Sequence, residues 1–173
     1  MIDVEAENLQ GFCSQKEVNE LVRLAEGRLV LEVGVWKGRC TIPMAKVAER
    51  VVAVDHFRGD RYTGRANTLP EFRANLERFG VGERVVPVLA DFVTCWPLLG
   101  LSRCGLLIYD GDHDEGPTRA ALGLFGSLLE GEPRVVAVHD YDYPQVRGCV
   151  DEFAAEHRLG VRVVDRLAIL SGG

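Results

Sequence analysis

Short apolar runs alternate along this chain with longer amphipathic segments. Five of the runs are bounded by glycine or polar residues and indicate buried strands, at residues 28–34, 51–55, 84–89, 104–109 and 135–138. The early runs do not alternate between apolar and polar residues, as expected when helices cover both faces of a parallel sheet. This order predicts right-handed crossovers and a Rossmann-like α/β fold: a doubly wound, mostly parallel sheet with helices on both faces.

The amphipathic segments between the runs predict helices, at residues 41–49, 69–79, 118–129 and 145–158. Another helix is expected to begin after Ser14, because Glu17 completes a capping box and apolar residues follow at helical spacing. A final pair of short strands is expected at residues 161–164 and 168–170. Ligands of such sheets bind outside the carboxyl ends of the strands, so the residues that close each strand are the candidates for chemistry.

Composition narrows the choice of partners. The 173 residues fit a single domain, residues 1–173, with a net charge of −6 and scattered basic residues. Nucleic acids and anionic membranes both favour clustered lysine and arginine, so neither is expected, and a small molecule or a protein partner is the better candidate. A homo-oligomer stays open, since an N-terminal helix outside the sheet could pair subunits.

The cysteines and the N-terminus indicate a cytoplasmic protein. The five cysteines are odd in number, and no two form a C-x-x-C pair or show metal-ligand spacing. We therefore expect buried thiols in a reducing compartment. No basic segment leads into an apolar stretch at the start of the sequence, and the apolar runs are too short to span a membrane.

The turn after the first strand has the pattern Glu32-x-Gly34-x-x-x-Gly38. Its glycines allow a tight turn and a close approach to a ligand, and the helix behind them offers free N–H groups. The dinucleotide fingerprint G-x-G-x-x-G is absent, because residues 35–37 are not glycine. A carboxylate at Glu32 suits a ligand with a cationic ammonium group and repels a pyrophosphate. The alternative is an ordinary strand-to-helix turn.

Two aspartates close the next two strands. Asp55 follows the turn by about twenty residues, where a carboxylate can accept hydrogen bonds from both hydroxyls of a ribose. Asp91 follows the third strand, where an adenine amino group could be recognised. Each could instead be a residue that begins a turn or caps a helix.

The fourth and fifth strands end in polar clusters, which comprise Asp110, Asp112 and His113 in one case and His139 and Asp140 in the other. Neighbouring parallel strands would bring both clusters to the same edge of the sheet. Carboxylates there can hold Mg²⁺ or Ca²⁺, and a histidine beside them also suits a transition ion or can act as a general base. The alternative is that the aspartates only cap helices and order loops.

Together these motifs resemble the class I S-adenosylmethionine-dependent methyltransferases. Within that class the sequence is similar to the small O-methyltransferase-like group related to macrocin O-methyltransferase and the cephalosporin-hydroxylase-like proteins, over about residues 29–170. The matching segments are the E-x-G-x-x-x-G turn, Val51–Asp55, Ala90–Asp91, Tyr109–His113, and His139–Pro144 followed by Val146, Arg147 and Val150. A glycine is more usual in the family before Asp91.

The resemblance implies an S-adenosylmethionine-dependent methyltransferase, acting on the hydroxyl group of a small molecule. The residues expected to bind the cofactor are Glu32, Gly34, Trp36, Gly38, Asp55, His56, Asp91 and Phe92. His113 or His139 is expected to be the base, with Asp110 and Asp140 positioning the small-molecule acceptor. Metal-dependent relatives imply that Asp110 and Asp140 hold Mg²⁺ or another divalent cation, although His139 stands where those relatives often have an acidic ligand.

Two other functions fit the same fold. One is a nucleotide- or NAD-binding oxidoreductase, which Glu32 and the missing third glycine oppose. The other is a non-catalytic member of the fold that binds the cofactor as a sensor or partner subunit. The loop at residues 58–68 is expected to be a lid over the cofactor or, alternatively, a solvated loop.

Overall fold

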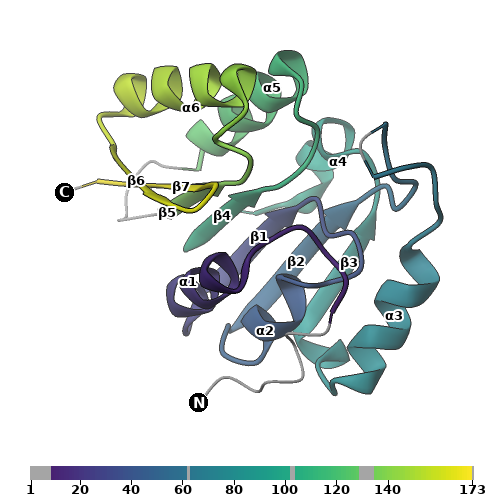
Figure 1. Cartoon of the computed structure of the whole chain (residues 1–173). Coiled ribbons are helices and arrows are strands. Elements are labelled where there is room, and N and C mark those ends of the chain that lie inside the picture. The colour runs from purple at the N-terminus through teal and green to yellow at the C-terminus, as the bar shows by residue number, and fades with distance from the viewer. Residues whose placement is uncertain (1–8, 62, 102–103, 129–134, 173) are drawn as a thin grey trace.

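A computed structural model describes residues 9–61, 63–101, 104–128 and 135–172 of the chain. These residues form a seven-stranded sheet in the order β3-β2-β1-β4-β5-β7-β6 (Figure 1). The strands are β1 (Leu29–Val33), β2 (Arg50–Asp55), β3 (Val85–Leu89), β4 (Leu106–Tyr109), β5 (Val135–Val138), β6 (Gly160–Val164) and β7 (Leu167–Ser171). Strands β1 to β5 are parallel, and β7 runs antiparallel to both β5 and β6. The predicted fold class is confirmed.

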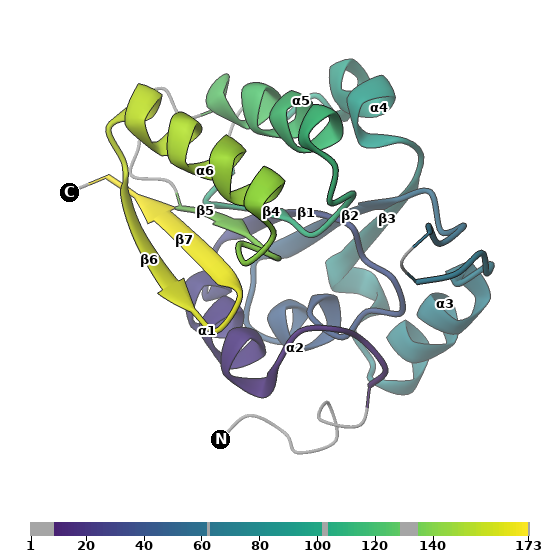
Figure 2. The same cartoon turned by 45° about the horizontal axis from the view of Figure 1, so that its top comes forward.

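Helices cover both faces of this sheet. They are α1 (Gln15–Ala25), α2 (Thr41–Ala45), α3 (Leu69–Arg78), α4 (Phe92–Leu99), α5 (Glu115–Gly126) and α6 (Pro144–His157), with a 3₁₀ turn at Gly82–Arg84. Helices α1 to α3 lie on one face and α4 to α6 on the other (Figures 1 and 2). Each layer has its own cluster of buried apolar side chains. Among the described residues, no helix is both long enough and apolar enough to cross a membrane.

Most predicted elements are present, and the first helix begins as its capping box predicts. The Ser14 hydroxyl accepts a hydrogen bond from the Glu17 N–H, and the Glu17 carboxylate accepts one from the Ser14 N–H at 2.6 Å. The predicted helix at 41–49 ends early, at Ala45, and turns back so that the Glu49 N–H reaches the carbonyl of Arg28. The bond from Glu49 holds the segment after α2 beside the start of β1.

The sequence pattern does not predict α4. Its residues are apolar almost all round, so it lacks the polar stripe of a surface helix, and Pro97 lies inside it. Asp91 begins the helix by accepting a hydrogen bond from the Thr94 N–H at 3.0 Å. Gly100 ends it in the left-handed conformation, with φ of 58°. The capping residues therefore delimit a helix that hydrophobic periodicity misses.

Strand register brings the ends of the parallel strands together. Val33 pairs with Tyr109, and Tyr109 pairs in turn with Val138. The ladder continues one step further, since the Asp110 N–H donates to Val33 at 2.8 Å and the His139 N–H donates to Tyr109 at 3.0 Å. The polar clusters after β4 and β5 consequently meet at one edge of the sheet, as predicted.

Candidate functional site

A cavity of about 460 Å³ lies at the carboxyl ends of the parallel strands. The predicted site residues that line it are Glu32, Gly34, Trp36, Asp55, His56, Asp91, Phe92, Asp110, His113 and Asp140. Gly38 and His139 are not among its lining residues. The residues chosen because they close strands thus converge on one cavity, as expected of a doubly wound sheet.

The two glycines of the first turn are needed for different local reasons. A Cβ at Gly34 would lie 1.9 Å from the carbonyl oxygen of Asp110, and its φ of +85° favours glycine. A Cβ at Gly38 would lie 3.1 Å from the side chains of Ile42 and Phe72. The close approach predicted for this turn therefore exists, but the backbone that approaches Gly34 belongs to the end of β4.

Asp55 holds the same turn through its side chain. Its Oδ2 accepts hydrogen bonds from the N–H groups of Val35 at 2.8 Å and Trp36 at 2.9 Å, and its Oδ1 accepts one from Phe57 at 2.6 Å. Trp36 and Phe57 have positive φ values of 52° and 55°, which are costly for residues other than glycine. Asp55 compensates that cost and also borders the cavity.

Glu32 is the buried acid of the site. The residue is only 2% exposed, and its Oε2 has no hydrogen-bond partner within the described part of the chain. Burial, together with the negative charges of Asp110 and Asp55, raises the pKa of Glu32 to about 8 against a lowering contribution from Thr41. The carboxyl group is therefore mostly protonated at neutral pH. A cation reaching this oxygen from the cavity would supply the missing partner and favour ionisation.

The residues after β3 combine a cap with packing. Asp91 caps α4, which is the structural alternative stated for it, and it also lines the cavity. Phe92 packs against Trp96 and Phe125, with ring centroids 5.3 and 5.6 Å away. Phe92 lines the cavity here, whereas Trp96, which packs behind it, does not.

The loop after β2 borders the cavity on another side. Its residues Gly59, Asp60 and Thr63 line the cavity, and Arg61 forms an ion pair with Asp114 on the loop after β4. His56 is more exposed, and its Nδ1 accepts a hydrogen bond from Arg58 at 3.1 Å. This position suits a lid, which stays a prediction; Tyr62 lies outside the described residues.

His139 lies behind the cavity wall among three carboxylates. Its Nε2 is 3.2 Å from Glu17 Oε2, and its Nδ1 is 3.1 Å from Asp110 Oδ1 and 3.0 Å from Asp140 Oδ2. Burial lowers the pKa of His139, but the interactions with Asp110 and Asp140 outweigh burial and hold the pKa well above its usual value. His139 is thus a buried imidazolium outside the lining of the cavity, and its role as the base stays a prediction.

Asp140 is surrounded by basic groups. Its Oδ1 is 2.7 Å from Arg166 Nη1, and its Oδ2 is 2.6 Å from His113 Nε2. The bond to Asp140 raises the pKa of His113 against the opposing effect of burial. The His113 ring also lies 5.0 Å from the ring of Tyr143, and both line the cavity. His113 is thus the predicted base candidate that borders the cavity.

Glu17 belongs to this network and was not expected there. It is fully buried, and it accepts a hydrogen bond from the Arg166 N–H at 2.7 Å in addition to its contacts with Ser14 and His139. Burial raises the pKa of Glu17, but these partners lower it by a larger total, so the carboxylate is ionised. The sequence signals Glu17 only as part of a capping box. Nothing local indicates a partner 122 positions away.

The segment before α1 also forms part of the cavity. Gly11, Phe12 and Cys13 line it, and the Phe12 ring lies 6.0 Å from the ring of Trp36. Two arginines hold the segment in place, since Arg39 donates to the Cys13 carbonyl at 2.6 Å and Arg166 to the Phe12 carbonyl at 2.8 Å. All five cysteines are buried free thiols, as predicted. The position of Cys13 beside the strand ends was not predicted.

Comparison with known proteins agrees with this geometry. A family model described as a methyltransferase domain matches residues 31–141. No curated protein matches the chain by sequence.

Several solved structures share the fold. The O-methyltransferase from Bacillus cereus, solved in complex with S-adenosylhomocysteine, gives a TM-score of 0.72 at 16% identity, covering 98% of this chain and 86% of that one. The O-methyltransferase NovP gives 0.71 at 19% identity, covering 90% and 79%. SMU.1697c from Streptococcus mutans, also solved with S-adenosylhomocysteine, gives 0.67 at 14% identity, covering 92% and 99%. At these identities the likeness establishes a common fold.

Proposed function

This chain belongs to the methyltransferase-domain family, and on that basis we propose that it is an S-adenosylmethionine-dependent methyltransferase acting on the hydroxyl group of a small molecule. The fold neighbours that were solved with S-adenosylhomocysteine, and those described as O-methyltransferases, support this assignment. When bound, S-adenosylmethionine supplies a methyl group on a positively charged sulfur. The rest of the mechanism concerns what the residues of the cavity do.

The observation that best supports the proposal is the buried carboxyl group of Glu32. A buried oxygen without a hydrogen-bond partner destabilises the protein. A cation or a hydrogen-bond donor that reaches this oxygen removes that cost, so its binding is favoured. The ammonium group of a bound methionine moiety has that charge. A pyrophosphate placed against Glu32 and Asp110 would instead be repelled, which disfavours the NAD-binding alternative.

The other strand-end residues fit the rest of such a cofactor. Gly34 provides a turn without a side chain in front of the following helix. Asp55 already accepts hydrogen bonds from two N–H groups of this turn, and it can also accept them from the hydroxyls of a ribose. Asp91 and Phe92 offer a carboxylate and an aromatic edge where an adenine would lie. In-line transfer needs alignment and exclusion of water more than chemical assistance, and a walled cavity supplies both.

The acceptor hydroxyl must also lose a proton. We assign this step to His113, because it lines the cavity and is oriented by Asp140 at 2.6 Å. The raised pKa of His113 makes its neutral form a stronger base and a less abundant one at neutral pH. Asp110 faces the same cavity and would position the acceptor.

The magnesium site implied by metal-dependent relatives does not fit the residues around Asp140. One oxygen of Asp140 already contacts the Arg166 guanidinium, and the other contacts His113 and His139. A hard cation prefers carboxylate, carbonyl and water oxygens, and the guanidinium would repel it. Asp140 is therefore an ion-pair partner of Arg166 and the two histidines, and it does not suit the role of a Mg²⁺ ligand.

The test uses two ligands that differ only in the amino-acid part. Calorimetric titration of the wild type with S-adenosylhomocysteine and with 5′-methylthioadenosine is expected to show binding of both. Glu32→Gln keeps the shape of a carboxyl group that is largely neutral in the free protein, so the fold should persist. We expect it to weaken S-adenosylhomocysteine by about tenfold or more and to leave 5′-methylthioadenosine unchanged.

Two outcomes would contradict the proposal. If the folded wild type binds neither ligand but binds NADH, the nucleotide-binding alternative takes its place. If the cofactor binds but no hydroxyl compound of a broad panel is methylated, the non-catalytic alternative gains support.

A further inference from the structure

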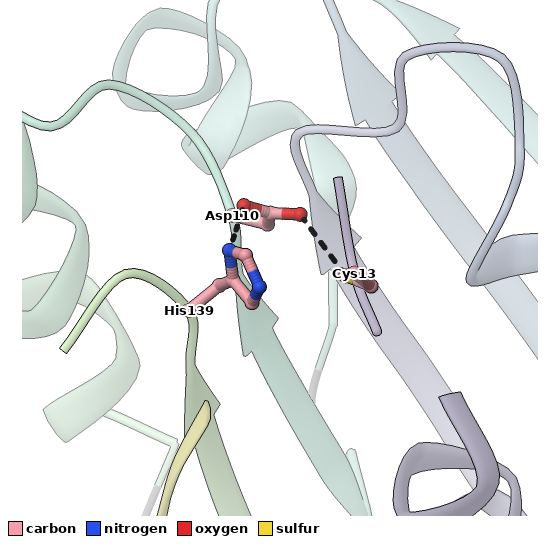
Figure 3. Close-up of side chains that lie close together, drawn as sticks. All are labelled: Cys13, Asp110 and His139. Carbon is pink, nitrogen blue, oxygen red and sulfur yellow. Dashed lines mark hydrogen bonds and ion pairs between the residues drawn. The ribbon is translucent and has the colours of Figure 1, made fainter. Parts of the chain in front are cut away.

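Three potential metal ligands converge at the wall of the cavity from distant parts of the chain. Cys13 precedes α1, Asp110 follows β4 and His139 follows β5, and Figure 3 shows Cys13 and His139 on either side of Asp110. Cys13 Sγ lies 3.7 Å from Asp110 Oδ2, and His139 Nδ1 lies 3.1 Å from Asp110 Oδ1. One ligand atom from each of the three residues lies within 4.8 Å of the other two.

These separations match a tetrahedral cation. Zinc binds nitrogen and oxygen at roughly 2.0–2.2 Å and sulfur at about 2.3 Å, which leaves neighbouring ligand atoms roughly 3–4 Å apart. The observed 3.1 and 3.7 Å, measured to the two different oxygens of Asp110, fall in that range, and one ligand atom from each residue lies within 4.8 Å of the others. A single ion could therefore touch all three side chains with small adjustments.

The histidine provides an independent observation. Its side chain is 1% exposed, and Nδ1 makes no hydrogen bond of acceptable geometry within the described residues, although two carboxylate oxygens lie 3.0 and 3.1 Å away. Its other nitrogen, Nε2, lies 3.2 Å from the buried carboxylate of Glu17. Histidines that bind metals generally donate their second ring N–H to such a carboxylate, which fixes the tautomer and the ring orientation.

We propose that Cys13, Asp110 and His139 form a binding site for one divalent transition-metal ion of the zinc type. A thiolate, an imidazole and a carboxylate together select borderline and soft ions over Mg²⁺, which prefers oxygen alone. The ion replaces the thiol proton of Cys13 and the Nδ1 proton of His139, so binding releases protons to solvent. In this site His139 takes the position that an aspartate or glutamate ligand would hold in a site made of carboxylates alone.

The geometry also indicates what such an ion does. Cys13 and Asp110 line the cavity whereas His139 lies behind it, so the fourth coordination position faces the cavity. The ion fastens the segment before α1 to the ends of β4 and β5. Its contact with an acceptor hydroxyl rests on the proposed function, but its binding does not.

The experiment titrates chelator-washed, reduced protein with Zn²⁺ by calorimetry and with Co²⁺ by absorption spectroscopy. We expect one ion per chain, no competition by Mg²⁺, and a near-ultraviolet thiolate-to-cobalt charge-transfer band. Cys13→Ser should abolish the band and weaken Zn²⁺ binding by about tenfold or more. Cys95→Ser is the matched control, because Cys95 is also buried but contacts the Phe92 carbonyl away from the cluster; it should keep both signals.

The outcomes separate the metal site from the methyltransferase assignment. Absence of stoichiometric Zn²⁺ binding, or equal binding by the wild type and Cys13→Ser, would overturn the site and leave the cluster as an internal ion-pair network. S-adenosylhomocysteine is titrated into the same samples. Its binding without Zn²⁺ binding removes only the metal site, and the reverse result removes only the proposed function.

Discussion

The two sides of the cavity are built in different ways. On the cofactor side, Glu32, Gly34 and Asp55 lie on or directly after the first two strands, and the N–H groups of Val35 and Trp36 in the turn donate hydrogen bonds to Asp55. On the opposite side, charged groups from α1, from the ends of β4 and β5, and from the turn before β7 neutralise one another, and the Glu17–His139 pair joins residues 122 positions apart. The first side needs only the pairing of β1 with β2, whereas the second also needs β4, β5, α1 and the turn before β7 in place.

The largest effect is expected at Gly34, where the two sides touch. In Gly34→Ala, a methyl group would meet the Asp110 carbonyl and the backbone would hold a positive φ, so we expect a loss of about 4 kcal/mol or more of unfolding free energy and no cofactor binding. Urea unfolding measures the first and calorimetry the second. Gly116→Ala on α5 is the control, since its Cβ meets nothing within 4 Å, and it should not destabilise the protein.

The next largest effect tests whether the charged groups on the side of the cavity opposite Glu32 depend on ion pairs that are buried. Glu17→Gln removes a fully buried partner of His139, and we expect it to lower the unfolding free energy by about 3 kcal/mol. Glu20→Gln, three residues later on α1, removes the half-buried partner of two exposed arginines, Arg23 and Arg162, and should cost less than about 1 kcal/mol. Equal losses in urea unfolding would show that burial of the network does not matter.

A smaller effect is expected from the pH dependence of Glu32. Its pKa is about 8 in the folded protein and ordinary in the unfolded chain, so the unfolded state loses its proton first as pH rises. Wild-type stability should therefore fall relative to Glu32→Gln by about 2 kcal/mol from about pH 5 to about pH 7. Unfolding curves at several pH values measure the difference. Parallel stability profiles for the two proteins would contradict the assignment of a buried, protonated acid.

The smallest effect is a shift in the titration of His113. The pKa of its ring should lie above the ordinary value of 6.5, and Asp140→Asn should lower the titration midpoint towards that value. NMR of the histidine ring protons measures both midpoints, and His56→Gln serves as the assignment control. If His113 is the base, methyl transfer should increase with pH through the same midpoint. An unchanged midpoint in Asp140→Asn would remove Asp140 as its orienting partner.

Sequence predicted most of the fold because burial on both faces leaves a clear pattern in parallel strands. The five parallel strands and the helical layers follow from apolar runs and amphipathic periods. The exception is α4, whose apolar surface and internal Pro97 remove the usual signal. Its ends are set by capping at Asp91 and Gly100, which periodicity does not record.

The site was predictable to the extent that strand ends determine it. Asp110 and His139 were expected to meet because neighbouring parallel strands end at one edge, and they do. Glu17 and Cys13 could not be found in this way, since their positions depend on how α1 packs against the sheet. Their contacts join residues 122 and 97 positions apart, and no local spacing encodes such pairs.

The most direct test of the central claim is a crystal structure of the protein grown with saturating S-adenosylhomocysteine. We predict the ligand in the cavity at the carboxyl ends of β1, β2 and β4, with its amino group within hydrogen-bond distance of Glu32 and its ribose beside Asp55. A cavity that stays empty at saturating ligand, or a ligand bound elsewhere on the chain, would contradict the assignment of this cavity as the cofactor site of a methyltransferase.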